Sequence, residues 1–334
     1  MTKVNFIEIY PNTDDKYAGE AIMPIYFPKM SHTPPCSLPE TRKDVPMREL
    51  IAKHKVLFLD SYGVLRGRTG HYPGTDRTIQ EILRQRKLIG IASNTAETSP
   101  EDIQEAWQKD GVSIPLEMIV TSGMVLGPYV KARELEGAPA IVIGNERSRQ
   151  YAEQAGLKPL PPEDPMQTYR QAEAVVVCDH PIDRSIIDAA INAILARCVP
   201  AVQTTTDRFV PFFHDREEKG VSLGVMGIAY QIKGATGVEP EIIGKPAQGI
   251  FDLIAKILED RGYGKEDALF AGDNLYEDIA GAAIAGFPSL LVESGMSGMY
   301  ARGTIGGPVA EYDQTLLALG IRPTYQLPSI LLPE

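Results

Sequence analysis

The chain has 334 residues, of which 43% are hydrophobic and 23% are charged, and its formal net charge is −11 at pH 7. This length allows two globular domains, and the acidic charge argues against nucleic acid or an anionic membrane as a partner. No stretch reaches the roughly 18 apolar residues of a membrane span. The N-terminal residues lack the apolar core of a secretory signal, so we expect a cytoplasmic protein without membrane contact.

The first 48 residues differ from the rest of the chain. Six prolines fall between Pro24 and Pro46 and argue against regular structure there. The stretch "KVNFIEIY" (3–10) alternates weakly, as an edge strand does. We therefore predict that residues 1–48 form an irregular arm laid on the main body.

From residue 49 onward, predicted strands and helices alternate. Buried strands are expected at "KVLFLD" (55–60), "LIGIASN" (88–94) and "LEMIVTSG" (116–123), and each is followed by a predicted helix, of which the first (74–87) is amphipathic. The helix at 99–111 has a capping signal, because Ser99 and Pro100 precede an acidic first turn. Such alternation predicts an α/β fold with a doubly wound parallel sheet.

The alternation of predicted strands and helices continues after residue 137. Strands are expected at 138–145, 172–179 and 199–205, and helices at 183–198 and 220–237. After residue 239 follow "PEIIGK" (240–245), a helix, "ALFAGD" (268–273), another helix and "FPSLLVES" (287–294). One sheet does not comfortably hold so many strands, so we predict a discontinuous core domain (49–137 and 240–334) interrupted by an inserted α/β cap (138–239).

Polar residues stand at the carboxyl ends of four predicted strands. They are Asp60, Ser93 with Asn94, Lys245 and Asp273. In a doubly wound sheet these ends form the ligand crevice. The set suits phosphoryl transfer, because a carboxylate can form an aspartyl-phosphate, two carboxylates can hold Mg²⁺, and a lysine and a hydroxyl can stabilise phosphate oxygens.

The stretches around these residues, "FLDSYGVL", "IASNT", "IIGKP" and "FAGDNLYED", resemble in their order the four motifs of the haloacid dehalogenase (HAD) superfamily of hydrolases. The 151-residue separation of Asn94 and Lys245, with "YPGT", "VTSGMV" and "AVQTTTDRFVP", resembles the C2-capped, NagD-like branch of sugar phosphatases and p-nitrophenylphosphatases. The resemblance implies a Rossmann-like core and a cap that selects a small phosphorylated metabolite. Members of this branch often dimerise through the cap, so a homodimer is expected.

The resemblance also implies roles for individual residues. Asp60 resembles the nucleophile, Ser93 the phosphate-binding hydroxyl with Asn94 and Thr95 beside it, and Lys245 the phosphate-binding lysine. A Mg²⁺ ion is implied as cofactor. Its implied ligands are Asp60, the main-chain carbonyl of Tyr62, Asp273 and Asp278.

Tyr62 departs from the phosphatase pattern, which has an aspartate at this position as the general acid and base. The phenol of tyrosine has an ordinary pKa of about 10 and is a poor replacement, and the dehalogenase branch does carry a tyrosine here. Three alternatives stay open: a phosphatase with weakened acid catalysis, a dehalogenase-like hydrolase acting at carbon, and a catalytically silent phosphometabolite-binding protein. The first is favoured, because Asp273 and Asp278 suit a cation that dehalogenation at carbon does not need.

Fewer signals come from the cap and from the cysteines. Asp207 and His214 lie in the stretch that faces the active site in this branch, and both are candidate substrate contacts. Cys36, Cys178 and Cys198 show neither metal nor redox spacing and are predicted to be free thiols, with a Cys178–Cys198 disulfide as the less favoured alternative. The identity of the substrate is not readable from the sequence.

Overall fold

The computed structural model describes residues 6–9, 25–28, 40–67, 70–180, 183–214, 217–301 and 320–332. Within these ranges, the side chains of 6–9, 25–28, 211–214, 217–220, 300 and 301 are not described. Most of the predicted N-terminal arm therefore lies outside the described residues. The exception is a two-stranded antiparallel sheet of β1 (Phe6–Ile9) and β2 (Ile25–Pro28), and the second of these strands was not expected in the proline-rich stretch.

The first sheet has six parallel strands, and β3 lies inside it with every residue buried. The sequence "VLFL" of β3 is apolar throughout, as expected for a strand covered on both faces. In spatial order the strands are β17 (Tyr325–Leu327), β16 (Ser289–Val292), β15 (Ala268–Gly272), β3 (Val56–Leu59), β6 (Leu88–Ser93) and β7 (Ile119–Thr121).

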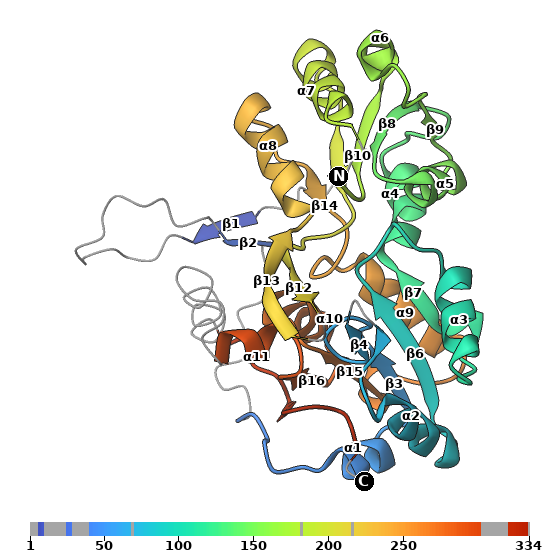
Figure 1. Ribbon diagram of the computed structural model, residues 1–334. Coiled ribbons are helices and arrows are strands. Elements are labelled where there is room, and N and C mark those ends of the chain that lie inside the picture. Colours follow the sequence, from blue (N-terminus) through green and yellow to red (C-terminus); the bar gives the residue numbers. More distant parts are fainter. Residues whose placement is uncertain are drawn as a thin grey trace, which may run out of the picture.

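Helices pack against this sheet (Figure 1). Contacts join α2 to β6, and both α3 and α9 to β7. The helix α3 begins as predicted, with Ser99 as its cap and Pro100 in the first turn. The helices of this part are α1 (Met47–Lys53), α2 (Thr75–Arg84), α3 (Pro100–Lys109), α4 (Leu126–Ala132), α9 (Gly249–Glu259), α10 (Gly281–Ala285) and α11 (Met296–Ala301).

The second sheet has five parallel strands and lies above the first in Figure 1. In spatial order they are β14 (Glu241–Ile242), β11 (Ala201–Gln203), β10 (Ala174–Val177), β8 (Pro139–Ile143) and β9 (Lys158–Pro159). Its helices are α5 (Glu146–Gln154), α6 (Pro165–Thr168), α7 (Ser185–Arg197) and α8 (Met226–Thr236). The expected α/β architecture, a mostly parallel sheet flanked by helices with a second α/β part inserted in its sequence, is confirmed.

Two predicted elements differ from the structure. The strand expected at 240–245 is shorter, and as β14 it pairs with β11 of the second sheet, because Ile242 lies in register with Gln203. The helix expected at 220–237 begins only at Met226, because β13 (Glu217–Leu223) pairs antiparallel with β12 (Phe209–His214). The chain thus returns to the first sheet only after Ile242, and the predicted domain limits remain a prediction.

The strands of the second sheet alternate between two buried clusters. Ile141 and Ile143 of β8 point into a cluster with α7 and α8, whereas Ala140 and Val142 join the cluster that surrounds the first sheet. Because neighbouring residues of a strand face opposite sides, the second sheet contributes one of its faces to the core of the first. This shared packing supports the region where the carboxyl ends of both sheets meet.

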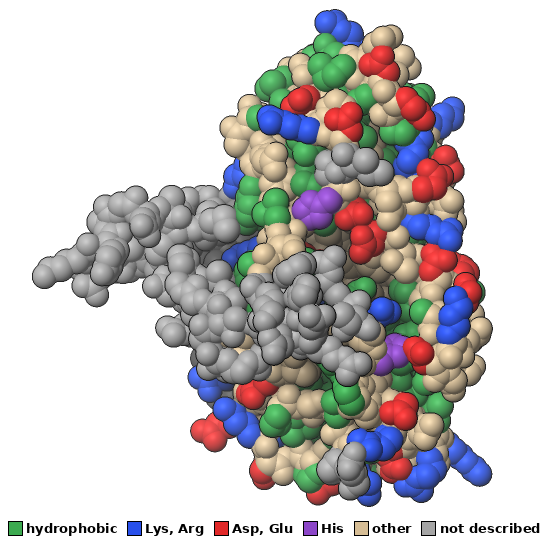
Figure 2. Space-filling view, in the orientation of Figure 1, with side chains coloured by type: hydrophobic (Ala, Val, Ile, Leu, Met, Phe, Trp, Pro, Cys, Tyr) green, Lys and Arg blue, Asp and Glu red, His purple; other side chains and the backbone are tan. Residues whose placement is uncertain are grey.

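No helix within the described ranges is long and apolar enough to cross a membrane. On the face drawn in Figure 2, acidic and basic side chains are interspersed, and the visible basic ones form no continuous patch. Cys178 and Cys198 are free thiols, as predicted, while Cys36 lies outside the described residues.

Candidate active site

A cavity of about 570 Å³ lies between the two sheets. The ends of β3, β6 and β15 bring Asp60, Ser93 and Asp273 to its wall, and the loops after β10 and β11 supply the opposite side. This is the place at which ligands bind in doubly wound sheets, outside the carboxyl ends of the strands. The residues predicted from four separate strand ends therefore share one cavity.

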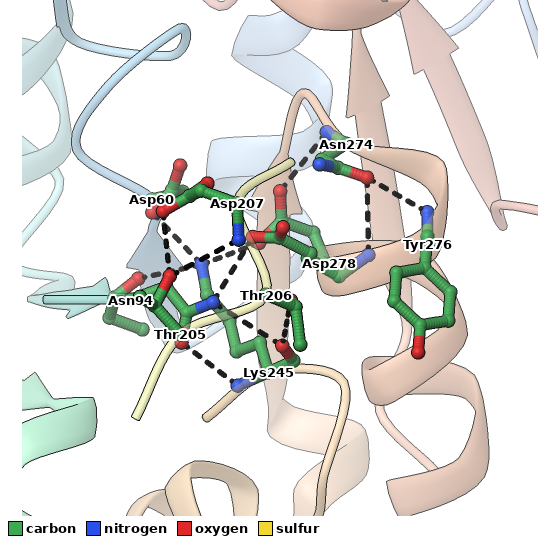
Figure 3. A network of polar contacts seen from close by, with 11 residues as sticks. Asp60, Asn94, Thr205, Thr206, Asp207, Lys245, Asn274, Tyr276 and Asp278 are labelled. Atoms are coloured by element: carbon green, nitrogen blue, oxygen red, sulfur yellow. Dashed lines mark hydrogen bonds and ion pairs between the residues drawn. The ribbon is translucent and has the colours of Figure 1, made fainter. Parts of the chain in front are cut away.

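Lys245 connects two of the predicted acidic residues. Its Nζ donates to Asp60 Oδ1 at 2.9 Å and to Asp278 Oδ1 at 2.6 Å, and also to the carbonyl oxygen of Ala92 at 3.1 Å (Figure 3). Asp60 is 9% exposed, and Lys245 and Asp278 are 1% exposed. Burial lowers the pKa of Lys245, but the nearby carboxylates of Asp278 and Asp60 outweigh this effect and hold the pKa above its usual value. The ammonium therefore stays charged in a site where an unpaired ion would be strongly disfavoured.

The backbone of Lys245 is held from both sides of the cavity. Asn94, at the end of β6, accepts from the Lys245 N–H at 2.9 Å and donates to its carbonyl oxygen at 3.3 Å. Thr206, from the loop after β11, donates to the same carbonyl at 2.7 Å. A Cβ on the preceding Gly244 would overlap the carbonyl of Thr204. Gly244 therefore allows the backbone before Lys245 to approach the backbone of Thr204 closely. This approach positions Lys245 so that its ammonium reaches Asp60 and Asp278.

Asp273 directly follows β15, and its Oδ2 accepts from the Met296 N–H at 2.6 Å. Two glycines leave room for this carboxylate, because a Cβ on Gly63 or Gly295 would overlap it. Gly63 also has a φ of +81°, a conformation that residues with a side chain rarely adopt. The glycine after Tyr62 is therefore needed both for the turn and for the placement of Asp273.

Three carboxylates form a candidate metal centre. Asp60, Asp273 and Asp278 each have an oxygen within 4.8 Å of the others. Burial raises the pKa of Asp60 to about 7 and that of Asp273 well above its ordinary value, and in Asp273 the charges of Asp60 and Asp278 add to the shift. Lys245 is a single positive charge against three carboxylates, so ionisation of all three would leave negative charge uncompensated, and the raised pKa values reflect this repulsion together with burial. A divalent cation would compensate this charge, and carboxylate oxygens are the ligands that Mg²⁺ prefers.

Two further acids lie beside this cluster. Glu277, which was not among the predicted site residues, is 5% exposed, and its Oε2 accepts from Asn94 Nδ2 at 3.2 Å. Burial raises the pKa of Glu277 well above its ordinary value, and the charge of Asp207 adds to this shift. The predicted Asp207 lines the cavity and accepts from Thr205 Oγ1 at 2.7 Å. The acidic run of "YED" was the available signal for Glu277, but only the turn at 275–280 decides that its side chain points to Asn94.

Tyr62 has surroundings unlike those of Asp60. Its side chain is 49% exposed and forms part of the cavity wall. The guanidinium of Arg66 lies 5.2 Å from the centroid of its ring. The tyrosine is therefore at the predicted site, with its ring open to the cavity.

The other predicted residues fall into two groups. Ser93 is 5% exposed, and both Ser93 and Thr95 line the cavity together with Asn94. The side chain of His214 lies outside the described residues, although its backbone belongs to β12. The catalytic, binding and metal-ligating roles of all these residues remain predictions, as does the carbonyl of Tyr62 as a metal ligand.

Two family models match this chain. The model described as haloacid dehalogenase-like hydrolase matches residues 57–158, and that described as HAD-hydrolase-like matches residues 242–330. Between them they contain all four motifs of the cavity, from Asp60 to Asp278.

Curated relatives match most of the chain at low identity. A D-glycerol 3-phosphate phosphatase of Mycobacterium tuberculosis is 26% identical over 255 residues, which are 75% of this chain and 66% of that protein. A dihydroxyacetone phosphatase of Corynebacterium glutamicum is 27% identical over 71% of this chain and 80% of its own. The chain thus spans about two thirds to four fifths of these relatives.

Solved structures show the same fold. A possible sugar phosphatase of the HAD superfamily from Cytophaga hutchinsonii has a TM-score of 0.72 at 24% identity and covers 88% of this chain and 100% of its own. A p-nitrophenyl phosphatase from Archaeoglobus fulgidus has a TM-score of 0.65 at 23% identity and covers 83% of this chain and 97% of its own. With three motifs at the strand ends of the first sheet, the fourth at Lys245 in the same cavity, and two matching family models, the chain belongs to the haloacid dehalogenase superfamily of hydrolases.

Proposed function

We propose that the protein is a Mg²⁺-dependent phosphatase that hydrolyses small phosphate esters through an aspartyl-phosphate on Asp60. The observation that supports this most directly is the buried arrangement of Asp60, Lys245 and Asp278, with Asp273 beside them, at the wall of the cavity. The curated relatives named above are phosphatases of small metabolites, which supports the same class of substrate. A homodimer formed through the predicted cap (138–239) remains a prediction.

The proposed reaction has two displacements at phosphorus. A carboxylate oxygen of Asp60 attacks phosphorus, and the bond from phosphorus to the ester oxygen breaks. The leaving oxygen keeps the electron pair and takes a proton from water. Water then attacks the phosphorus of the aspartyl-phosphate, which releases inorganic phosphate and restores the carboxylate.

The other residues of the site have binding roles in this proposal. Lys245 and the hydroxyl of Ser93 stabilise the phosphate oxygens, where charge spreads in the transition state. Asp60, Asp273 and Asp278 would hold Mg²⁺, with the carbonyl of Tyr62 as a further ligand, and the cation would screen the repulsion between the anionic nucleophile and the anionic substrate. Asp207 and His214 stay candidate contacts of the leaving group.

The proposal is tested by a panel of phosphate esters assayed with Mg²⁺ and with a chelator, in the wild type and in Asp60→Asn. The amide is nearly isosteric but cannot form the acyl-phosphate, so turnover should fall to background while the protein still unfolds in a cooperative melting transition. Asp76→Asn, an exposed position in α2, is the matched control and should keep full activity. Turnover that persists in Asp60→Asn would remove Asp60 from the mechanism.

Tyr62 favours one alternative, a hydrolase that acts at carbon. Such an enzyme would release halide from 2-halo acids in the presence of chelator, whereas the proposed phosphatase would not. Tight binding of phosphate esters without turnover in either assay would instead identify a silent binding protein.

A further inference from the structure

We propose that Tyr62 is a specificity residue whose ring stacks on the leaving group, so that the site selects phosphate esters of planar aromatic alcohols. This inference rests on the proposed function and adds the chemical class of the substrate. Tyr62 stands two residues after Asp60 and lines the same cavity. A leaving group bonded to a phosphate at Asp60 therefore lies within the space onto which this ring opens.

The exposure of Tyr62 is the first observation that points to a ligand. Its side chain is 49% exposed, whereas Phe58 of the neighbouring strand is 1% exposed. Among the Phe, Trp and Tyr side chains that the structure describes, Tyr62 is the exposed one, since all others are buried or half-buried. A ring that is accessible beside a nucleophile can bury apolar area against a ligand and can stack on an aromatic one.

The ring is also held in place. The chain turns back after Tyr62, with hydrogen bonds from the Gly63 N–H to the Arg66 carbonyl at 2.9 Å and from the Arg66 N–H to the Ser61 carbonyl at 3.1 Å. This turn puts the guanidinium of Arg66 5.2 Å from the ring centroid, a distance at which the cation attracts the face of the ring. An oriented ring can stack on a ligand with little loss of conformational entropy.

The cavity wall combines apolar and aromatic side chains with polar and charged ones. A cavity of about 570 Å³ has the volume of a typical small-molecule site. The apolar part of this wall would be covered by the hydrocarbon surface of an aromatic leaving group. Besides Tyr62, the apolar and aromatic side chains of the wall include Tyr72, Phe209, Leu223, Met296 and Met299.

The chemistry of the leaving group gives an independent reason. A phosphatase without an acid at position 62 breaks most easily a bond to an oxygen that leaves as a stable anion. Aryl oxides meet this condition much better than alkoxides. The accessible ring of Tyr62 and the missing acid therefore favour the same class, phosphate esters of aromatic alcohols.

The test measures binding, so that it does not depend on how well a group leaves. Phenylphosphonate and cyclohexylphosphonate are non-hydrolysable and similar in size, and their Kd values with saturating Mg²⁺ are measured by calorimetry. The wild type should bind the phenyl compound about 3- to 10-fold more tightly, which is the range of an aromatic pair. Tyr62→Phe should keep this preference and Tyr62→Leu should lose it, with cyclohexylphosphonate changed by less than about twofold.

Tyr169→Leu is the matched control, since Tyr169 also lies under an arginine, with Arg170 at 5.4 Å, and is remote from the cavity lining. It should leave the preference unchanged. Equal affinity of the wild type for both compounds, or a Tyr62→Leu variant that keeps the preference, would overturn the inference. A protein that prefers phenylphosphonate but hydrolyses no phosphate ester would contradict the proposed phosphatase while upholding the role of Tyr62.

Discussion

Asp60 and Tyr62 are two residues apart, yet their surroundings are opposite. Asp60 is 9% exposed and accepts from Lys245, whereas Tyr62 is 49% exposed and lies under Arg66. Burial and the contact with Lys245 therefore set the electrostatic state of the first side chain, whereas the second is accessible along the cavity wall. Replacing Tyr62 with an acid tests whether the site lacks a general acid at this position.

We expect Tyr62→Asp to raise kcat/KM for alkyl phosphates, because it adds a carboxyl able to donate a proton to the leaving oxygen. General acid–base assistance is worth about 10² to 10⁴ in rate. For p-nitrophenyl phosphate the gain should be small where formation of the aspartyl-phosphate limits the rate, since its phenolate leaves without a proton. Matched alkyl and aryl esters assayed with saturating Mg²⁺ give the comparison.

A variant that folds, binds Mg²⁺ and gains nothing on alkyl esters would contradict the missing-acid interpretation of Tyr62. Tyr62→Asn is the matched control, since it removes the same ring but adds no titratable group.

His54 makes the stability of the fold depend on pH. It is 2% exposed, and burial, followed by the charges of Lys53 and Lys87, lowers its pKa from 6.5 to about 4, although Asp267 opposes the shift. Below pH 6.5 the unfolded chain binds a proton at His54 that the folded protein does not bind until about pH 4. The contribution of the neutral ring is therefore complete above pH 6.5 and is lost as the pH falls to about 4.

Between pH 7 and pH 4.5 this loss should be about 2 to 3 kcal/mol of unfolding free energy. His54→Phe, measured by urea denaturation at both pH values, should show a pH dependence smaller by that amount. Other groups also titrate in this range, but they contribute equally to the pH dependence of both proteins, so their contribution cancels in the difference. Equal pH dependence in both proteins would show that His54 is not responsible.

Among the helices, α3 has the most complete local signal at its start. Ser99 Oγ accepts from the Asp102 N–H at 3.1 Å, and Asp102 Oδ2 accepts from the Ser99 N–H at 3.3 Å. We expect Ser99→Ala to lower the unfolding free energy by about 1 kcal/mol, because an N–H of the first turn loses its acceptor. Urea denaturation measures the change, and Ser113→Ala in an exposed loop is the control. A loss no larger than that of the control would mean that the cap does not stabilise the helix.

The hairpin of β12 and β13 shows how pairing overrides a local pattern. The stretch "GVSL" extends a helical pattern toward its N-terminus, but Ser222 and Leu223 pair with Val210 and Phe209. Backbone hydrogen bonds to a neighbouring strand satisfy these residues, so the helix α8 starts at Met226 instead.

At the scale of the whole molecule, cation binding should be visible as thermal stability. Asp273 and Asp278 follow β15, whereas Asp60 follows β3, so a bound cation would join parts of the chain that separate on unfolding. A ligand at 100 times its Kd stabilises the folded state by about 2.7 kcal/mol, which corresponds to several degrees in Tm. We expect saturating MgCl₂ to raise the Tm of the wild type by this amount, and that of Asp273→Asn by less than about half of it.

Asp76→Asn should shift as the wild type does, and NaCl of equal ionic strength should reproduce little of the effect. A shift of the same size in Asp273→Asn would remove Asp273 from the metal centre.

The sequence by itself determined the features that depend on neighbours along the chain. Apolar runs ending in Asp60 and Asp273 specified buried strands, and Ser99 specified the start of a helix, because periodicity and capping act over a few residues. The order of the four motifs also predicted that their side chains meet, since parallel strands end at one edge of a sheet.

Only the tertiary structure decided which distant groups contact one another. The pairing of β14 with β11, the bond from Thr206 to the Lys245 carbonyl and the approach of Asn94 to Glu277 join residues 39 to 183 positions apart. The exposure of Tyr62 to the cavity is also a tertiary property, since among the residues that the structure describes it is 49% exposed and lines the cavity. Such contacts depend on which surfaces bury each other when the two sheets close on a shared core, and a local sequence pattern holds no information about that choice.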